Sequence, residues 1–434
     1  MGTKKILLIL IILIALFLRL HNLDYMEFKK DEAIYSFKAS RMVENGVIPL
    51  TSGVSSVGIN EPPLFVYLLS VPFLISKNPV IASGYIAILN VLAIFICFFV
   101  VKDLFDEKAG LIACAFYAVN PWGVFFSRKI WFPELLPFFI MLFVFFIYKS
   151  IFQGKNIYLI YSIIVLGFIS QLHFTAFYFA IIFIVIIIRY WKKICWKYLM
   201  IGTAFFILIA TPYTVYQFKN NFTDIVKLRK LTDRENRFNK DTFSTILKLS
   251  TTNGFEASFG NDYQSFENEI FKINLFDTLQ MLALVSAFIY FIVNYNSKLF
   301  ILLLWLLFGT LSLVFTKVTL ANHYFLHLLP LIFIVLGNLF RWLLESKLKT
   351  VRYGVSTYVL VLLIYQFYFS FSLISFAKNQ HCINGDYGPP FSYRVAGVRK
   401  AMDEGKKNVD DIQAYCKCVK CDRAATMYII RYLN

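Results

Sequence analysis

The sequence is poor in charged residues. Of its 434 residues, only 16% are Asp, Glu, Lys or Arg, whereas about a quarter are charged in ordinary soluble proteins. Hydrophobic residues make up 59% of the chain, 48 residues are Phe, and the mean hydropathy is +0.64. A chain of this length cannot bury so much apolar surface in water-soluble domains. The composition therefore predicts an integral membrane protein.

Three other features are missing. The sequence contains no Gly-rich phosphate-binding loop, so it does not support a nucleotide-sugar donor or ATP coupling. No small-x-small cleavage site precedes Arg19, so we expect residues 6–20 to remain as an uncleaved first span. The formal charge of +17 comes from basic residues that separate apolar runs. They do not form a patch interleaved with aromatic residues, which argues against nucleic-acid binding.

Long apolar runs fill most of the chain. On a criterion of about 20 residues per span, they predict an all-α polytopic membrane protein with about eleven transmembrane helices. The runs are residues 6–20, 81–101, 109–126, 135–148, 157–172, 174–188, 198–216, 273–293, 299–315, 324–340 and 355–376.

Residues 61–76 form a shorter apolar run that contains Pro72, and this run is below the usual spanning length. If the run does not cross the membrane, basic clusters such as 189–197 and 341–352 fall on the cytoplasmic side, as the positive-inside rule requires. We therefore expect it to be a surface helix. The N-terminus is then cytoplasmic, and the first loop and the C-terminus lie outside a bacterial or archaeal plasma membrane.

This topology predicts two domains. Residues 1–376 form the transmembrane domain, with a first outer loop at 21–80 and a long outer loop at 217–272, and residues 377–434 form a small outer C-terminal domain. Four cysteines lie in this tail, and in an oxidising compartment they favour two disulfides. A zinc site built from the same four residues is the alternative. The four are Cys382, Cys416, Cys418 and Cys421.

The first outer loop is the candidate site because it gathers acidic residues directly beyond a membrane helix. It carries the adjacent pair Asp31 and Glu32, and Glu61 precedes a double proline. A carboxylate in this position can act as a general base towards a hydroxyl group. Other outer loops supply further polar residues: Arg128, Glu134, His173, Lys317, His323 and Tyr324. An anionic ligand would explain Arg128, Lys129 and Lys317 at outer helix ends, and so would lipid headgroups.

Several short motifs resemble a known family. They are similar to the polyprenyl-phosphate-sugar-dependent glycosyltransferases of the GT-C fold, which include protein O-mannosyltransferases and the transferases that add aminoarabinose to lipid A. The resemblance covers residues 19–136 and, beyond them, rests on topology and on His323-Tyr324 through Pro330. The motifs are Arg19-Leu20, Asp31-Glu32-Ala33 with Tyr35, Pro62-Pro63-Leu64 with Tyr67, Asn120-Pro121, Ser127-Arg128 and Pro133-Glu134.

The resemblance implies a membrane glycosyltransferase of the cell envelope. Such an enzyme moves a sugar from a polyprenyl-phosphate donor to an acceptor hydroxyl on a lipid, glycan or protein, with inversion. It also implies that Asp31 is the acting acid, with Glu32 beside it, and it places the family's second acid on Glu134. Relatives of the aminoarabinose type carry a lysine before the double proline, where this chain has Glu61. That departure weakens a phosphate-binding role there and leaves the acceptor class open.

We assign the candidate residues to three roles. Asp31 and Glu32 are catalytic. Cations that face the leaving phosphate stabilise its developing charge, so the expected phosphate-binding residues are Arg128, Lys317, His323 and Tyr324. The expected sugar- or acceptor-orienting residues are Glu61, Glu134 and His173. Glu61 and Glu134 could instead hold a divalent ion, the one possible cofactor.

A second class of function is a transporter or flippase for a lipid-linked or anionic substrate. Transporters place ionisable residues and broken helices near the bilayer midplane. Here the apolar runs are nearly free of charge and the acids gather at one surface. This distribution favours the enzyme.

Overall fold

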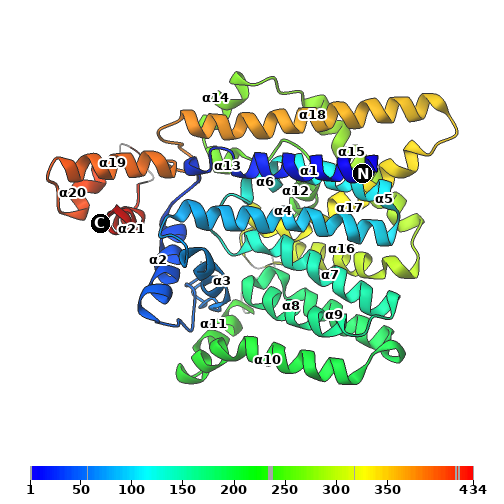
Figure 1. Cartoon of the computed structure of the whole chain (residues 1–434), viewed down its shortest axis with the longest axis horizontal. Coiled ribbons are helices and arrows are strands. Elements are labelled where there is room, and N and C mark those ends of the chain that lie inside the picture. The colour runs from blue at the N-terminus through cyan, green and yellow to red at the C-terminus, as the bar shows by residue number, and fades with distance from the viewer. Residues whose placement is uncertain are drawn as a thin grey trace.

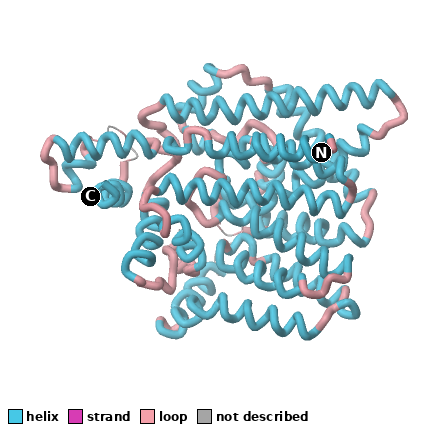
Figure 2. Tube along the Cα trace, viewed as in Figure 1, coloured by secondary structure: helices cyan, strands magenta, loops and turns pink. Residues whose placement is uncertain are grey.

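The computed structural model describes residues 2–433, except 56, 233–237, 317, 416, 417, 419 and 420. Within these residues all regular structure is helical (Figure 2), apart from three isolated β-bridges. The all-α class predicted from the sequence is confirmed.

Each predicted apolar run coincides with a helix or a pair of consecutive helices, and these helices lie side by side in a bundle (Figure 1). In the described residues, seven helical stretches are long and apolar enough to cross a membrane, and they contain α4, α7, α10, α15, α16, α17 and α18. The total of eleven spans stays a prediction, because the helices of four predicted runs, α1, α5 with α6, α8 and α9, are not among the seven. The helices are α1 (Thr3–Leu20), α4 (Pro79–Leu104), α5 (Glu107–Val119) with α6 (Pro121–Phe126), α7 (Leu136–Gln153), α8 (Tyr158–Leu172), α9 (Tyr178–Arg189), α10 (Trp196–Lys219), α15 (Asn274–Val293), α16 (Phe300–Val314), α17 (Leu329–Leu344) and α18 (Lys349–Asn379).

Helix α17 forms the centre of the bundle. Every residue from Leu329 to Phe340 is buried, whereas α10 buries only Gly202 and Gln217. A helix that is apolar on all sides is satisfied either inside the protein or against lipid, so α10 presents its surface to the membrane. Gly337 lets α17 approach α5 closely, because a Cβ at this position would lie 2.7 Å from the Ala109 carbonyl oxygen.

The short helix α3 (Leu64–Phe73) comes from the ambiguous apolar run and contains Pro72. Lys4 at the start of α1 and Lys102 near the end of α4 both form ion pairs with Glu107. The start of α1 and the end of α4 therefore lie at the same end of the bundle, which we call the Glu107 end. The chain therefore crosses the bundle once through α1 and crosses back once through α4. The helix α3, which lies between them in the sequence, does not cross the bundle.

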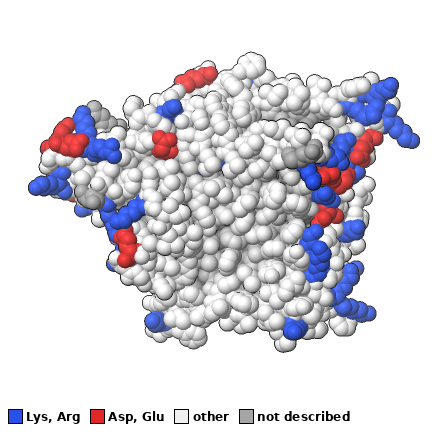
Figure 3. All heavy atoms as spheres, in the orientation of Figure 1, with Lys and Arg blue, Asp and Glu red and all other residues white. Residues whose placement is uncertain are grey.

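Charged side chains gather at the two ends of the molecule and leave an uncharged band between them (Figure 3). At the Glu107 end, Lys149 forms an ion pair with Asp103 and Arg341 with Asp106. The opposite end, which we call the α2 end, carries α2 (Lys30–Asn45), α3 and the C-terminal helices (Figure 1). This separation is typical of a protein whose middle lies in hydrocarbon.

The chain beyond α18 extends past the bundle at the α2 end (Figure 1). It contains α19 (Phe391–Asp403), α20 (Val409–Gln413) and α21 (Arg423–Leu433). A disulfide joins Cys382 to Cys418, and Cys421 is also disulfide-bonded. Cys416 lies outside the described residues. Oxidation of all four tail cysteines in pairs therefore stays a prediction.

We predict that cysteines placed at Asp31 and at Lys102 label from opposite sides of the membrane, because Asp31 lies at the α2 end of the bundle and Lys102 at the Glu107 end. The measurement is labelling with a membrane-impermeant maleimide in intact cells, with Cys97, Cys114 and Cys195 replaced. Asp31→Cys should label before lysis and Lys102→Cys only after it. Labelling of Lys102→Cys in intact cells would refute this topology.

Candidate active site

Two buried arginines fix the point at which α1 ends and the loop towards α2 begins. Arg128 donates from Nη1 to the carbonyl oxygens of Leu18, Arg19 and His21, and from Nη2 to that of Asn22, at 2.8 to 3.3 Å. The last carbonyls of a helix lack partners within the helix, and a basic side chain can satisfy them. Arg128 therefore caps α1.

Arg19 makes the reciprocal contact. Its guanidinium donates to the carbonyl oxygens of Tyr117, at 3.2 Å, and Ala118, at 2.8 Å, near the end of α5. Both arginines are at least 94% buried. The sequence predicted a phosphate contact for Arg128, but here its guanidinium is occupied by backbone carbonyls, so that contact stays a prediction.

A buried carboxylate lies between two lysines close to this cap. Glu27 is 3% exposed and forms ion pairs with Lys29, at 2.5 Å, and with Lys129. Burial disfavours the charged carboxylate, but the two ammonium groups outweigh this effect and hold the pKa of Glu27 below its ordinary value. Lys129 also lies over the rings of Phe125 and Phe126. We call Glu27, Lys29 and Lys129 the ion cluster.

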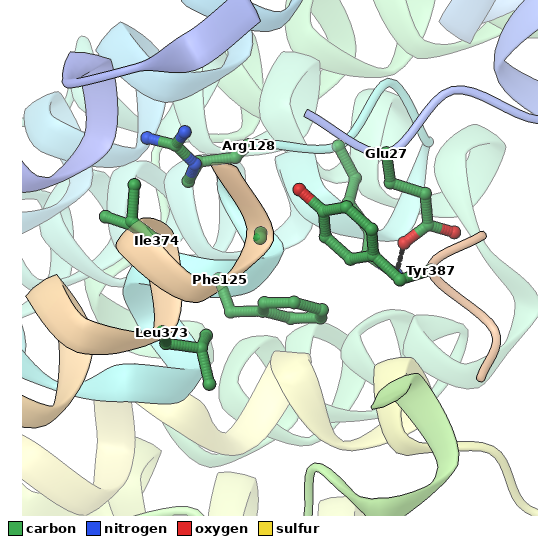
Figure 4. Close-up of a pocket in the computed structure, with 8 residues that line it drawn as sticks. Glu27, Phe125, Arg128, Leu373, Ile374 and Tyr387 are labelled. Atoms are coloured by element: carbon green, nitrogen blue, oxygen red, sulfur yellow. Dashed lines mark ion pairs between the residues drawn. The ribbon is translucent and has the colours of Figure 1, made fainter. Parts of the chain in front are cut away.

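A pocket beside the ion cluster is lined by Glu27, Arg128, Lys129 and Tyr387. In Figure 4, Tyr387 lies between Glu27 and Arg128, and the dashed line marks the ion pair of Glu27. The Tyr387 hydroxyl donates to the carbonyl oxygen of Tyr25 at 2.6 Å. The chain beyond α18 therefore reaches the predicted site.

The predicted catalytic pair occupies the first turn of α2. Glu32 is 2% exposed and accepts a hydrogen bond from the Lys29 amide at 2.9 Å, which caps the helix. Burial, with Glu27 nearby, raises the pKa of Glu32 to about 7. Asp31 is exposed and makes no hydrogen bond or ion pair with any described residue. The adjacent acids thus differ in role, since one is a buried cap and the other is free.

Asp31 faces a second polar group on α2 and the loop that follows it. The Tyr35 hydroxyl donates to Glu61 Oε2 at 2.8 Å. Partial burial raises the pKa of the Glu61 carboxyl, and Asp31 adds to the effect by repulsion. Limited hydration also raises the pKa of Asp31, although Lys29 and Lys30 oppose the shift. Asp31 therefore interacts electrostatically with Glu61 and also with Lys29 and Glu27 of the ion cluster.

A group of aromatic side chains packs next to Tyr35, whose ring contacts that of Phe132 with centroids 5.9 Å apart. The ring of His173 stacks on Phe132 at 5.3 Å and contacts Tyr324 at 5.2 Å. His323 contacts Trp131 at 4.1 Å and Tyr324 at 4.4 Å. His173 thus lies against the adjacent residues His323 and Tyr324, although they are about 150 positions apart in the sequence. Trp131 and Phe132 pack against the same group.

Glu134 lies deeper, in the short helix η2 (Pro133–Leu135). It is 1% exposed, and neither carboxylate oxygen has a hydrogen-bond partner among the described residues. Its charged neighbours are Lys129, Glu27 and Glu32, whereas those of Glu61 are Asp31 and Lys38. Glu61 and Glu134, which the sequence suggested could together hold a divalent ion, therefore have different charged neighbours. Within the described chain, no three His, Cys, Asp or Glu side chains are grouped to hold a metal ion.

A mainly apolar cavity of about 500 Å³ opens beside Glu61. Its polar lining includes Glu61, His173, Tyr213 and Asp224. Asp224 lies in α11 (Thr223–Thr232) and accepts hydrogen bonds from Asn60, Tyr213 and Gln217. This volume falls in the range of small-molecule sites. The cavity is therefore a candidate binding site, with the carboxylates of Glu61 and Asp224 in its lining.

The structure unites most of the predicted site residues at the α2 end. It adds Glu27, Lys29, Lys129, Tyr35 and Trp131, which the sequence analysis did not assign. The one available signal was a cation, Lys129, placed against the charge bias directly after Arg128. Lys317, a predicted phosphate contact, lies outside the described residues.

Known proteins share parts of this architecture. No curated protein matches the chain by sequence. Residues 60–216 match the family described as dolichyl-phosphate-mannose-protein mannosyltransferase, so the resemblance predicted from the motifs is confirmed.

Two solved structures have a similar overall fold. The ArnT protein from Cupriavidus metallidurans, bound to undecaprenyl phosphate, is 11% identical, covers 94% of this chain and 82% of its own, and has a TM-score of 0.64. The oligosaccharyltransferase of Archaeoglobus fulgidus in its apo form is 12% identical, covers 97% of this chain and 60% of its own, and has a TM-score of 0.54. These likenesses show the GT-C fold.

We predict that Glu27→Gln lowers the stability of the protein strongly. The substitution removes the ion-pair partner of two lysines, of which Lys129 is buried, and breaking a buried pair in this way typically costs about 3–5 kcal/mol. The matched control is Glu107→Gln, because Glu107 also lies between two lysines but its ion pairs are exposed. The measurement is the unfolding midpoint in detergent. Equal midpoints for the two variants would show that the ion cluster has no special structural role.

Proposed function

We propose that this chain, a membrane glycosyltransferase of the GT-C class that uses a lipid-phosphate-linked sugar, transfers the sugar to an acceptor hydroxyl at the α2 end. The general base is Asp31. The observation that supports this assignment is its exposed carboxylate, which has no partner among the described residues and interacts electrostatically with Lys29 of the ion cluster and with Glu61 of the cavity lining. No other acid among the predicted site residues combines these properties, since Glu32 caps α2, Glu61 is bonded to Tyr35 and Glu134 is buried.

The reaction is a single displacement. Asp31 takes the proton of the acceptor hydroxyl while the acceptor oxygen bonds to the anomeric carbon. The bond from that carbon to the phosphate oxygen breaks, and polyprenyl phosphate leaves with the electron pair. One displacement inverts the anomeric configuration. A raised pKa makes Asp31 a stronger base than an ordinary aspartate.

Lys29 is the cation that we place against the donor phosphate. Its side chain is 27% exposed, against 7% for Lys129, so it can contact a ligand while Lys129 holds Glu27. The leaving phosphate gains negative charge as the bond breaks, and a fixed cation stabilises that state more than the bound donor. His323, which interacts electrostatically with both lysines, lies behind this position.

The cavity suits a neutral or hydroxyl-bearing group rather than the phosphate. The charged residues in its lining are Glu61 and Asp224, and the nearby lysines Lys38 and Lys227 donate to the carbonyl oxygens of Ser52 and Gly58. Glu61 can accept hydrogen bonds from sugar or acceptor hydroxyls, and His173 is also part of the lining. The apolar walls fit the lipid portion of a substrate.

The site faces the outside of the membrane in this proposal. Basic residues gather at the Glu107 end, which the positive-inside rule assigns to the cytoplasm. The α2 end is then periplasmic or extracellular. The acceptor there is a lipid, a glycan or a protein. Comparing the masses of lipids and glycans from cells with and without the chain would identify it.

We predict that Asp31→Asn abolishes sugar transfer and leaves donor binding intact. The substitution keeps the shape of the side chain but removes the basic lone pair, and general-base catalysis is typically worth about 10²–10⁴ in rate. The measurements are turnover by purified protein and binding of undecaprenyl phosphate to the same preparation. Glu32→Gln is the control and should be milder, because Gln can still accept the Lys29 amide hydrogen bond. Retention of more than about a tenth of wild-type turnover would exclude Asp31 as the base.

We predict that kcat/KM falls at low pH with a midpoint above the ordinary pKa of an aspartate. The base must be ionised to act, and the surroundings raise the pKa of Asp31, so activity is lost as the pH falls through that raised value. The measurement is the pH profile of kcat/KM, which reports groups of the free enzyme. The midpoint should be the same in Glu32→Gln. A shift of the midpoint in that variant would assign the titration to Glu32 instead.

A further inference from the structure

The loop between α18 and α19, residues 380–390, reaches from the far end of the chain to the segment that precedes Asp31. We call it the tail loop. Glu27 and Pro390 form an antiparallel β-bridge, and the Phe391 amide donates to the Met26 carbonyl oxygen at 3.0 Å. The Tyr387 hydroxyl donates to the Tyr25 carbonyl oxygen at 2.6 Å. Three consecutive residues, the last of which is Glu27 of the ion cluster, are therefore held by the tail loop and the start of α19.

The tail loop also touches the ion cluster directly. The Lys29 ammonium donates to the carbonyl oxygen of Asp386 in addition to its ion pair with Glu27. Two fixed oxygens thus hold this ammonium group. A cation with two fixed partners is oriented before a ligand arrives, which is how a preorganised site lowers the cost of binding charge.

A third segment supports the tail loop from the other side. The amides of Asp386 and Tyr387 donate to the carbonyl oxygens of Ala257 and Ser258, at 2.9 and 2.8 Å. Asn384 donates from its amide and its side chain to Asp262. Gly385 makes this contact possible, since a Cβ there would lie 2.3 Å from the Ser258 carbonyl oxygen.

The C-terminal helices continue the same contact onto α2. The ring of Phe28 packs against Phe391 and Tyr428, with centroids 5.0 and 5.5 Å apart. Arg431 of α21 forms an ion pair with Glu44 near the end of α2. The disulfide between Cys382 and Cys418 ties the start of the tail loop to the chain that leads into α21. Both ends of the segment 25–45 are thus bound by one cross-linked unit.

We propose that the tail loop is a positioning element of the active site, and that the Cys382–Cys418 disulfide keeps it in place, so that sugar transfer depends on oxidation of this disulfide. This inference rests on the proposed function. The tail loop does not contact the reacting atoms. It acts through the backbone of residues 25–28 and through Lys29, because a displacement of about 1 Å in a catalytic group can cost on the order of 100-fold in rate.

The first test removes one hydroxyl. Tyr387→Phe loses the hydrogen bond to Tyr25 and keeps the ring, and it should lower kcat about three- to tenfold, as expected for a hydrogen bond of ordinary strength. The KM for the donor should stay unchanged, and the unfolding midpoint should fall no further than in the matched control, which loses a hydrogen bond of the same length. Tyr393→Phe is the matched control, because its hydroxyl donates at 2.6 Å to the Lys378 carbonyl oxygen and so bonds within the tail. This control should keep wild-type kcat.

The second test does not depend on activity. Hydrogen exchange of the backbone amides in residues 23–31 should be faster in Tyr387→Phe than in the wild type and in Tyr393→Phe. Faster exchange supports positioning even if no sugar transfer is detected, which would count against the proposed function alone. Equal exchange and equal kcat in the two tyrosine variants would overturn the positioning role.

The third test concerns the disulfide. A reductant should lower the turnover of the wild type to that of the double variant Cys382→Ser with Cys418→Ser, and should have no further effect on the double variant. Replacing the free cysteines Cys97, Cys114 and Cys195 should not alter the response to reductant. Full activity of the reduced wild type would overturn the dependence on this disulfide.

Discussion

The buried carboxylate of Glu27 is the interaction on which the α2 end depends. Glu27 joins three parts of the chain. Its carboxylate pairs with Lys29 in the same loop and with Lys129, the residue after Arg128, and its backbone forms a β-bridge with Pro390. Burying three charged groups is costly, and such clusters add little net stability when they are complete. Their effect is geometric, because any shift of one segment would leave a buried charge unpaired. The loop before Asp31 can therefore adopt few alternative positions.

The apolar framework was predictable from the sequence, because hydrocarbon compatibility is a property of each segment by itself. Residues 81–101 and 324–340, for example, became α4 and α17 as expected. The position of Asp31 was also predictable, since it depends on a nearby helix end. The hydrogen-bond partners of Arg128 were not predictable. They are backbone carbonyls 106 to 110 residues away, and every residue has such a carbonyl, so no residue type in the sequence identifies them. The pairing of Lys129 with Glu27 was not predictable either.

Adjacent residues in this site have different chemistry because the backbone turns them towards different surroundings. Glu32 faces the interior and caps a helix, whereas Asp31 faces the open side. The acids Glu61 and Asp224 line the cavity, whereas Lys29 and Lys129 belong to the ion cluster around Glu27. Asp31 interacts electrostatically with both groups, through Glu61 and through Lys29. The proposed base is therefore coupled both to the cation proposed for the donor phosphate and to a carboxylate of the cavity lining.

The hydrogen bond from Tyr387 to Tyr25 joins residues that are 362 positions apart. A ribosome adds roughly 5–20 residues per second, so the loop before Asp31 enters the membrane environment on the order of 20 to 70 s before its partner exists. During that interval the bundle can already form, because most of its helices precede residue 380. The tail loop therefore arrives after the helices of the bundle, and the complete site can form only once residue 387 has been synthesised. The order of synthesis alone thus separates insertion of the protein from the onset of its chemistry.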